Sequence, residues 1–152
     1  MKKLFIVIAL VLIIALPLAA ANPVRANGFG AGVYLGYPAG LTFRYGMDSF
    51  RVFGNLTNHF LAGAYLDLGV LYDIFSFEIA DIPFYFNAGA QIGIGYYVDT
   101  PFRMAADGVV GLSYYFDEQP IELFLNVALG YEFLGSKGFD YKAGIGGIWY
   151  FN

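Results

Sequence analysis

The sequence predicts an all-β protein, an eight-stranded antiparallel up-and-down transmembrane β-barrel preceded by a cleaved signal peptide. Three observations lead to this fold class: an apolar leader, a two-residue alternation of apolar and polar side chains, and aromatic residues near the ends of the apolar faces. Charged residues make up 13% of the chain, whereas soluble domains contain about 25%. The chain is therefore too apolar for an ordinary soluble domain.

The first residues have the three parts of a secretory signal peptide. Two lysines precede an apolar run at residues 4–18, and three alanines at residues 19–21 supply the small side chains of a cleavage site. Cleavage after Ala26 and a retained membrane helix are alternatives that the sequence leaves open. The expected organisation is a signal peptide at residues 1–21, a short N-terminal segment at residues 22–27 and an outer-membrane β-barrel at residues 28–152.

Eight segments alternate with the period of a β-strand. In the last hairpin, Leu123 and Leu125 fall on one face of a strand, while Glu122 and Asn126 fall on the other. Turn residues separate the segments, and the longest predicted connection spans residues 76–83. The eight predicted strands span residues 29–36, 41–47, 50–57, 62–73, 84–97, 102–116, 121–133 and 139–151.

The charged residues of these segments share the less apolar face. Eight strands enclose an interior just wide enough for side chains, so the large apolar set must point outward, into lipid. The reverse arrangement would cost about 2 to 4 kcal/mol for each arginine or lysine near the bilayer midplane. We therefore predict a closed lumen with a salt-bridged charge network made of Arg44, Arg51, Asp67, Asp73, Arg103, Asp107, Glu122, Glu132, Asp140 and Lys142.

Two further expectations concern the inner face. A last turn centred on Lys137 would set Glu132 opposite Lys142. Inward tyrosines should cover the inward glycines of neighbouring strands; these tyrosines are Tyr34, Tyr65, Tyr85, Tyr97, Tyr115 and Tyr150.

Aromatic residues open and close the outward faces, as expected where a barrel meets the two membrane interfaces. Residue 102 opens one such face, and Tyr114 and Phe116 close it, while small residues occupy its centre. The predicted aromatic girdle contains Phe84, Tyr96, Phe102, Tyr114, Phe116, Tyr131, Phe133, Tyr141, Trp149 and Phe151.

The segment Gly36-Tyr37-Pro38-Ala39-Gly40 resembles the Gly-x-Pro-x-Gly first turn of a small family of uncharacterised outer-membrane β-barrels described from spirochaetes. Residues 112–116, 120–124, 138–140 and 144–151 are similar to the closing strands of that family. The resemblance implies an eight-stranded barrel like the transmembrane domain of outer-membrane protein A, in the outer membrane of a Gram-negative cell. It implies contact with the barrel-insertion machinery and supplies no catalytic residues.

No catalytic, cofactor-binding or metal site is expected. The chain has no cysteine and a single histidine, His59, in a predicted loop that lacks a serine. Removal of the leader takes two of the 8 basic residues and leaves 12 acidic ones, a net charge of −6, which disfavours nucleic acid as a partner.

The sequence therefore predicts a non-enzymatic, structural or surface-binding protein, a monomer whose partners are outer-membrane lipids. The alternatives are a narrow channel for ions or small solutes and a lipid-modifying outer-membrane enzyme. The sequence does not identify a physiological partner or a ligand, and it does not fix the oligomeric state.

Overall fold

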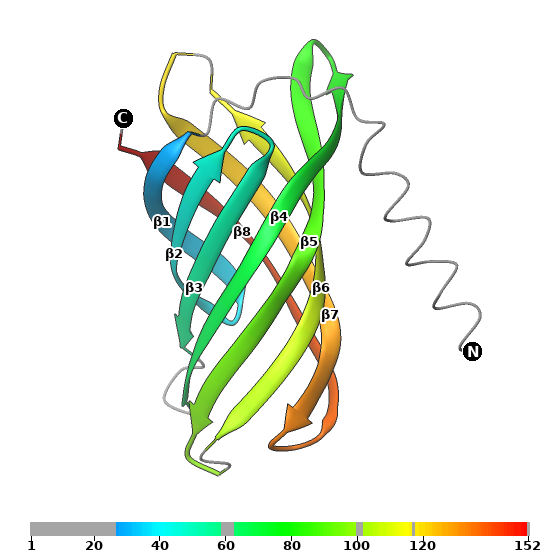
Figure 1. Ribbon diagram of the computed structural model, residues 1–152. Helices are drawn as coiled ribbons and strands as arrows, with labels where there is room; N and C mark the ends of the chain where they lie inside the picture. Colours follow the sequence, from blue (N-terminus) through cyan, green and yellow to red (C-terminus); the bar gives the residue numbers. More distant parts are fainter. Residues whose placement is uncertain (1–26, 59–62, 100–101, 117, 152) are drawn as a thin grey trace, which may run out of the picture.

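The computed structural model describes residues 27–58, 63–99, 102–116 and 118–151. Eight strands form a closed barrel, in which each strand pairs antiparallel with its neighbours in sequence and β1 pairs with β8 (Figure 1). The predicted fold class, an all-β barrel of eight antiparallel strands, is confirmed. The strands are β1 (Gly28–Tyr37), β2 (Ala39–Met47), β3 (Phe50–Asn58), β4 (Gly63–Ile79), β5 (Ile82–Tyr97), β6 (Arg103–Tyr115), β7 (Ile121–Leu134) and β8 (Gly138–Tyr150).

The predicted signal peptide at residues 1–21 lies outside the described residues, as does most of the short segment that follows it. Within the described part of the chain, no helix is long and apolar enough to cross a membrane.

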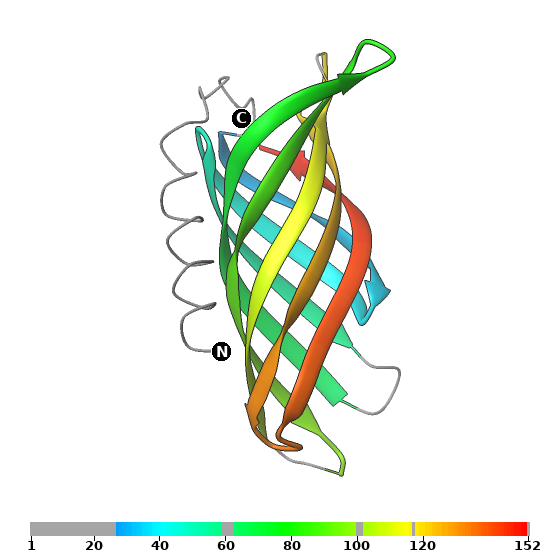
Figure 2. The ribbon, with the colours of Figure 1, turned by 90° about the vertical axis from the view of Figure 1, so that its right-hand side faces the viewer.

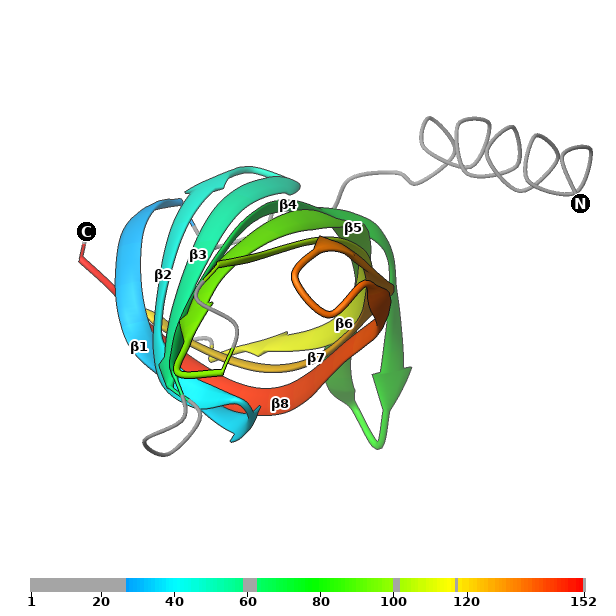
Figure 3. The ribbon, with the colours of Figure 1, turned by 90° about the horizontal axis from the view of Figure 1, so that it is seen from below.

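The two faces of each strand have opposite character. Leu56 pairs with Leu66 on the outer wall, and the neighbouring pair Asn55 and Asp67 is buried in the interior. The same alternation continues around the ring of strands, seen end-on in Figure 3. The outer wall therefore carries the large aliphatic and aromatic side chains, as the two-residue period predicts.

Side chains fill the interior in three apolar clusters that lie among the charged groups. The largest contains aromatic rings and one isoleucine, the second surrounds Phe53, and the third surrounds Tyr65. A ring needs space inside so narrow a barrel, and glycines on the neighbouring strands supply it. A Cβ at Gly144 would lie 2.6 Å from Cζ of Tyr34, and one at Gly69 would lie 2.6 Å from Cζ of Phe53.

We call the end of the barrel where β1 begins and β8 ends the terminal end, and the opposite end the distal end. Of the predicted girdle, Tyr96, Phe102, Tyr131, Phe133 and Tyr141 lie on the outer wall at the distal end. The other five, Phe84, Tyr114, Phe116, Trp149 and Phe151, lie at the terminal end.

Most connections agree with the sequence. Asp48 and Ser49 form the predicted two-residue turn between β2 and β3, and the amide of Asp48 donates to Oδ1 of Asn27 (2.8 Å). The predicted long connection at residues 76–83 is wrong. Here β4 continues to Ile79, and a two-residue turn at Ala80 and Asp81, both at positive φ (51° and 64°), leads directly into β5.

The β4–β5 hairpin projects past the rest of the wall at the terminal end (Figure 2). Pairing of β3 with β4 stops at Tyr72, and pairing of β6 with β5 reaches only to Tyr85. We call residues 74–84 the overhang. In the ladders of the described residues, its strands pair with each other and with no further strand. The alternation in its sequence explains why they remain extended: Phe75, Phe77 and Ile79 alternate with polar residues.

Candidate functional site: a charged barrel interior

All ten residues of the predicted charge network point into the barrel. Eight are buried, and the side chains of Arg103 and Asp140 retain exposed fractions of 22% and 20% at the distal end. The buried members are Arg44, Arg51, Asp67, Asp73, Asp107, Glu122, Glu132 and Lys142. Buried charges require partners, because burial removes their hydration.

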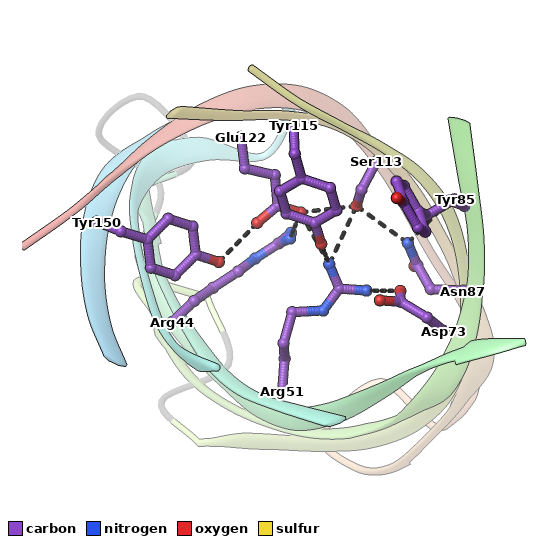
Figure 4. A network of polar contacts seen from close by, with 9 residues as sticks. All are labelled: Arg44, Arg51, Asp73, Tyr85, Asn87, Ser113, Tyr115, Glu122 and Tyr150. Atoms are coloured by element: carbon purple, nitrogen blue, oxygen red, sulfur yellow. Dashed lines mark hydrogen bonds and ion pairs between the residues drawn. The ribbon is translucent and has the colours of Figure 1, made fainter. Parts of the chain in front are cut away.

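The first group of partners surrounds the carboxylate of Glu122 on β7, whose side chain is fully buried (Figure 4). One of its oxygens accepts from Arg44 of β2 and from Nη1 of Arg51 of β3 (3.1 Å). The hydroxyl of Ser113 donates to the same oxygen (2.6 Å), and the hydroxyl of Tyr150 donates to the other (2.7 Å). We call this group the Glu122 cluster.

The two arginines of the Glu122 cluster have further contacts. Arg51 also pairs with Asp73 of β4 and donates to the hydroxyl of Tyr115. The guanidinium of Arg44 lies over the ring of Phe124, 4.0 Å from its centroid, which places the cation on the negative face of the ring. The two guanidiniums are therefore matched by two carboxylates, those of Glu122 and Asp73, and the cluster is neutral overall.

A second group, the Lys142 cluster, lies between β4, β6 and β8. Nζ of Lys142 contacts the carboxylates of Asp67 (3.0 Å), Asp107 (2.9 Å) and Asp140 (2.8 Å), one for each of its three donors. The amide of Gln91 also donates to Asp107 (2.8 Å). A single ammonium thus joins carboxylates from three strands, and no two of those strands are neighbours in the barrel.

A third pair lies at the distal end. Arg103 is 3.7 Å from Glu132, and its guanidinium lies over the ring of Tyr97 (4.2 Å). The other oxygen of Glu132 accepts from the amide (2.5 Å) and the hydroxyl (2.7 Å) of Ser136 in the last turn. Glu132 therefore ties the β7–β8 turn to the barrel interior.

The predicted register of the last hairpin is wrong. Glu132 lies opposite Gly138, and Lys142 lies opposite Ala128, although both charged side chains point inward as expected. The difference arises from the position of the turn, because the hairpin is centred on Gly135, which has positive φ (110°), and not on Lys137. Ser136 in this turn donates hydrogen bonds to the Glu132 carboxylate. Lys142 instead pairs with carboxylates of β4 and β6 across the lumen.

The prediction that inward tyrosines cover glycines holds for four of the six. The rings of Tyr34, Tyr65, Tyr97 and Tyr150 occupy the space that a Cβ would need at Gly144, Gly93, Gly63 and Gly30 respectively. Tyr85 and Tyr115 instead pack against each other, with ring centroids 5.2 Å apart.

Neutral polar residues complete both clusters, and the sequence reasoning had assigned them no role. Asn87 donates to Ser113 (3.1 Å), and Ser113 in turn donates to Glu122. Gln91 connects the carboxylates of the Lys142 cluster. Each of these residues lies on the inward face of its strand. They could have been identified from the sequence as the polar residues at the inward positions of the two-residue alternation.

The side chains around the Lys142 cluster leave little empty space in the barrel interior. A cavity of about 10 Å³ lies against Tyr34, Asn55, Asp67, Gln91 and Lys142. This volume is close to the minimum that holds one water molecule, and its polar lining suits one. The interior at the Lys142 cluster is therefore packed.

The other candidate sites add little. His59 lies outside the described residues. In the parts of the chain that the structure describes, no group of three or more His, Cys, Asp or Glu side chains is arranged to hold a metal ion.

The fold and its interior define a class of protein, a closed β-barrel with buried, salt-bridged polar residues. No protein-family model matches this chain, and no curated protein or solved structure is significantly similar to it. The resemblance to the spirochaete outer-membrane family stays a prediction.

Proposed function

We propose that the protein is an integral outer-membrane β-barrel with a sealed polar interior and a structural or surface-binding role without catalysis. One observation carries the proposal, the inversion of the usual distribution of side chains. Arg51 and Glu122 are 0% exposed, whereas Leu35 and Ile92 on the outer wall are 57% and 55% exposed. This is the arrangement expected of a barrel in an apolar solvent.

The closed ladder supports the same conclusion. In a bilayer, unpaired backbone N–H and C=O groups lack water, so a sheet must close on itself. Pairing of β1 with β8 over residues 30–37 and 143–150 meets that requirement. Exposed apolar side chains surround the barrel, whereas a soluble protein rarely exposes patches above a few hundred Å². Lipids are therefore the partner that the outer wall fits.

The predicted leader directs the chain out of the cytoplasm, and a strand-built barrel suits the outer membrane of a Gram-negative cell. The proposed protein is a monomer that the barrel-insertion machinery assembles. Connections such as the three-residue β7–β8 turn offer little loop surface at the distal end. The structural role is thus favoured over that of an adhesin.

The packed interior favours a sealed barrel over a narrow channel. Arg44, Arg51 and Lys142 each reach across the lumen to carboxylates on non-neighbouring strands, so the side chains bridge the path that an ion would follow. Refolded protein in a planar bilayer should therefore show no steady conductance steps. Stable, ion-selective steps would replace the sealed barrel with the channel.

The membrane assignment has its own test. The chain without its leader is refolded in detergent and run unboiled and boiled on a gel, because a closed transmembrane barrel resists detergent until heated. We expect the two samples to migrate differently and the native protein to partition with outer-membrane extracts. A folded monomer that stays in solution without detergent or lipid would exclude the proposal.

A further inference from the structure

The overhang has one apolar face, and a β-bulge creates it. Pairing along β4 and β5 shifts by one residue between Asp73 and Phe75. Without the extra residue, Phe75, Phe77 and Ile79 would lie on the face that continues the barrel interior. The bulge places them on the outward face instead.

The aromatic side chains of both strands then form a ladder. Phe75 lies opposite Phe86 with ring centroids 5.1 Å apart, and Phe77 lies opposite Phe84 at 6.0 Å. At the tip, Ile79 pairs with Ile82, and their side chains are 59% and 43% exposed. On β5 this face has the same phase as the outer wall below it, so the apolar surface runs without interruption from the barrel into the overhang.

The opposite face of the overhang is polar on β4, and Pro83 of β5 lies there opposite Glu78. Ser76 and Glu78 are exposed there and alternate with the aromatic residues of β4. Asp81 is exposed in the turn. The overhang is thus an amphipathic two-stranded ribbon, which is marginal in water unless something covers its apolar face.

An apolar groove of about 810 Å³ lies under the overhang. Ile82 and Phe84 line one side of it, and Leu112, Leu123 and Ile145 of the outer wall are among the residues that line the rest. Ser113 also belongs to the lining, but its side chain is buried and its hydroxyl bonds Glu122 in the interior. Tyr114 adds a phenolic hydroxyl to the lining, and the remaining residues that line the groove are mostly aliphatic or aromatic. The groove therefore offers mainly hydrophobic contact.

We propose that the overhang is an interfacial anchor, which lays its apolar face into the membrane leaflet at the terminal end of the barrel while acyl chains fill the groove beneath it. The inference rests on the proposed function, because the groove floor is the wall that faces lipid in that proposal. Continuity of the apolar face with this wall identifies the occupant as lipid. Phe84 of the overhang packs against Tyr114 of the terminal aromatic residues, with ring centroids 6.0 Å apart. This contact places the overhang near the headgroup boundary, where interfacial amphipathic helices bury their apolar face by about 5–10 Å.

Tryptophan fluorescence tests this placement. Trp149 is the single tryptophan and lies on the outer wall, so it reports insertion of the barrel itself. In a Trp149→Phe background, Phe77→Trp places the probe on the apolar face, and Glu78→Trp places a matched probe on the polar face one residue away. Each full mature chain is refolded into phosphatidylcholine vesicles that contain brominated acyl chains, and aqueous iodide serves as the opposing quencher.

We expect the Phe77→Trp chain to have blue-shifted emission, to lose emission to bromine and to resist iodide, and the Glu78→Trp chain to behave in the opposite way. Ile79→Trp, on the same face as Phe77, provides the same measurement if the first variant does not refold. Heat-dependent gel migration shows which variants have folded.

The outcomes separate the two proposals. If bromine quenches Trp149 of the native chain but iodide quenches Phe77→Trp and Glu78→Trp alike, the barrel is inserted and the overhang stands in water. That result overturns the anchor alone. If brominated lipid does not quench Trp149 of the native chain, the membrane assignment itself fails.

Discussion

Replacement of Glu122 by glutamine tests how strongly the interior network holds the barrel together. The carboxylate of Glu122 is fully buried and accepts from two guanidiniums and two hydroxyl groups. Glutamine preserves its size but removes the negative charge, so Asp73 alone would face Arg44 and Arg51. Breaking a buried ion pair by removal of one partner costs about 3–5 kcal/mol, because an uncompensated charge stays buried. We expect the free energy of unfolding to fall by that amount.

The assay is urea-induced unfolding in lipid vesicles, followed by the fluorescence of Trp149. Trp149 lies on the outer wall, on β8 opposite Ile121. Ile121 directly precedes Glu122 in the sequence. The matched control is Glu118→Gln in the exposed β6–β7 connection, where we expect a change within about 0.5 kcal/mol.

A double-mutant cycle separates lost charge from lost packing. Arg44→Met added to Glu122→Gln leaves Arg51 and Asp73 as a neutral pair, so the double variant should lose less stability than the sum of the single changes. We expect a coupling free energy of about 0.5–3 kcal/mol between Arg44 and Glu122. Equal effects of Glu122→Gln and Glu118→Gln, or strict additivity in the cycle, would refute the network as a source of stability.

Three further changes have expected outcomes in the same urea assay. Lys142→Met leaves three carboxylates without their shared ammonium and should cost about 3–5 kcal/mol; an unchanged midpoint would contradict that role. Gly144→Ala meets an inward tyrosine ring and should cost about 1–3 kcal/mol, whereas Gly138→Ala, with nothing within 4 Å of its Cβ, should be neutral. Ile92→Arg on the outer wall should cost about 2–4 kcal/mol in lipid, and tolerance equal to that of Gln119→Arg in the exposed β6–β7 connection would indicate an outer wall in water.

The faces of the strands could be predicted from the sequence because the side-chain period of a strand is two and each face has one solvent. Glu122 and Lys142 are on the inner face as the alternation requires, and Leu123 and Trp149 are on the outer face. The closed order of the strands follows from short connections between eight such segments. These properties depend on composition and spacing alone, and both are visible in a single chain.

The pairings inside the barrel could not be predicted, because they depend on geometry across the lumen. Lys142 reaches Asp67, which lies 75 positions earlier in the chain, and no local pattern encodes that approach. The bulge before Phe75 also escaped prediction, since it changes the phase within a continuous strand without a turn residue to mark it. The connection predicted at residues 76–83 is instead an extended hairpin, in which Ser76 and Glu78 occupy one face of β4.

The buried charges matter for strand register as well as for stability. Backbone ladders join each strand only to its neighbours, whereas Glu122 joins β7 to β2 and β3 across the lumen. A slip of β7 by one residue would turn its carboxylate toward the outer wall, and a slip by two would keep it inside but move it away along the strand from Arg44 and Arg51. A purely apolar interior would tolerate the second slip, because one aliphatic contact replaces another. The ion pairs penalise it, so we expect the same residues that are costly to bury to favour the observed position of β7 relative to β2 and β3.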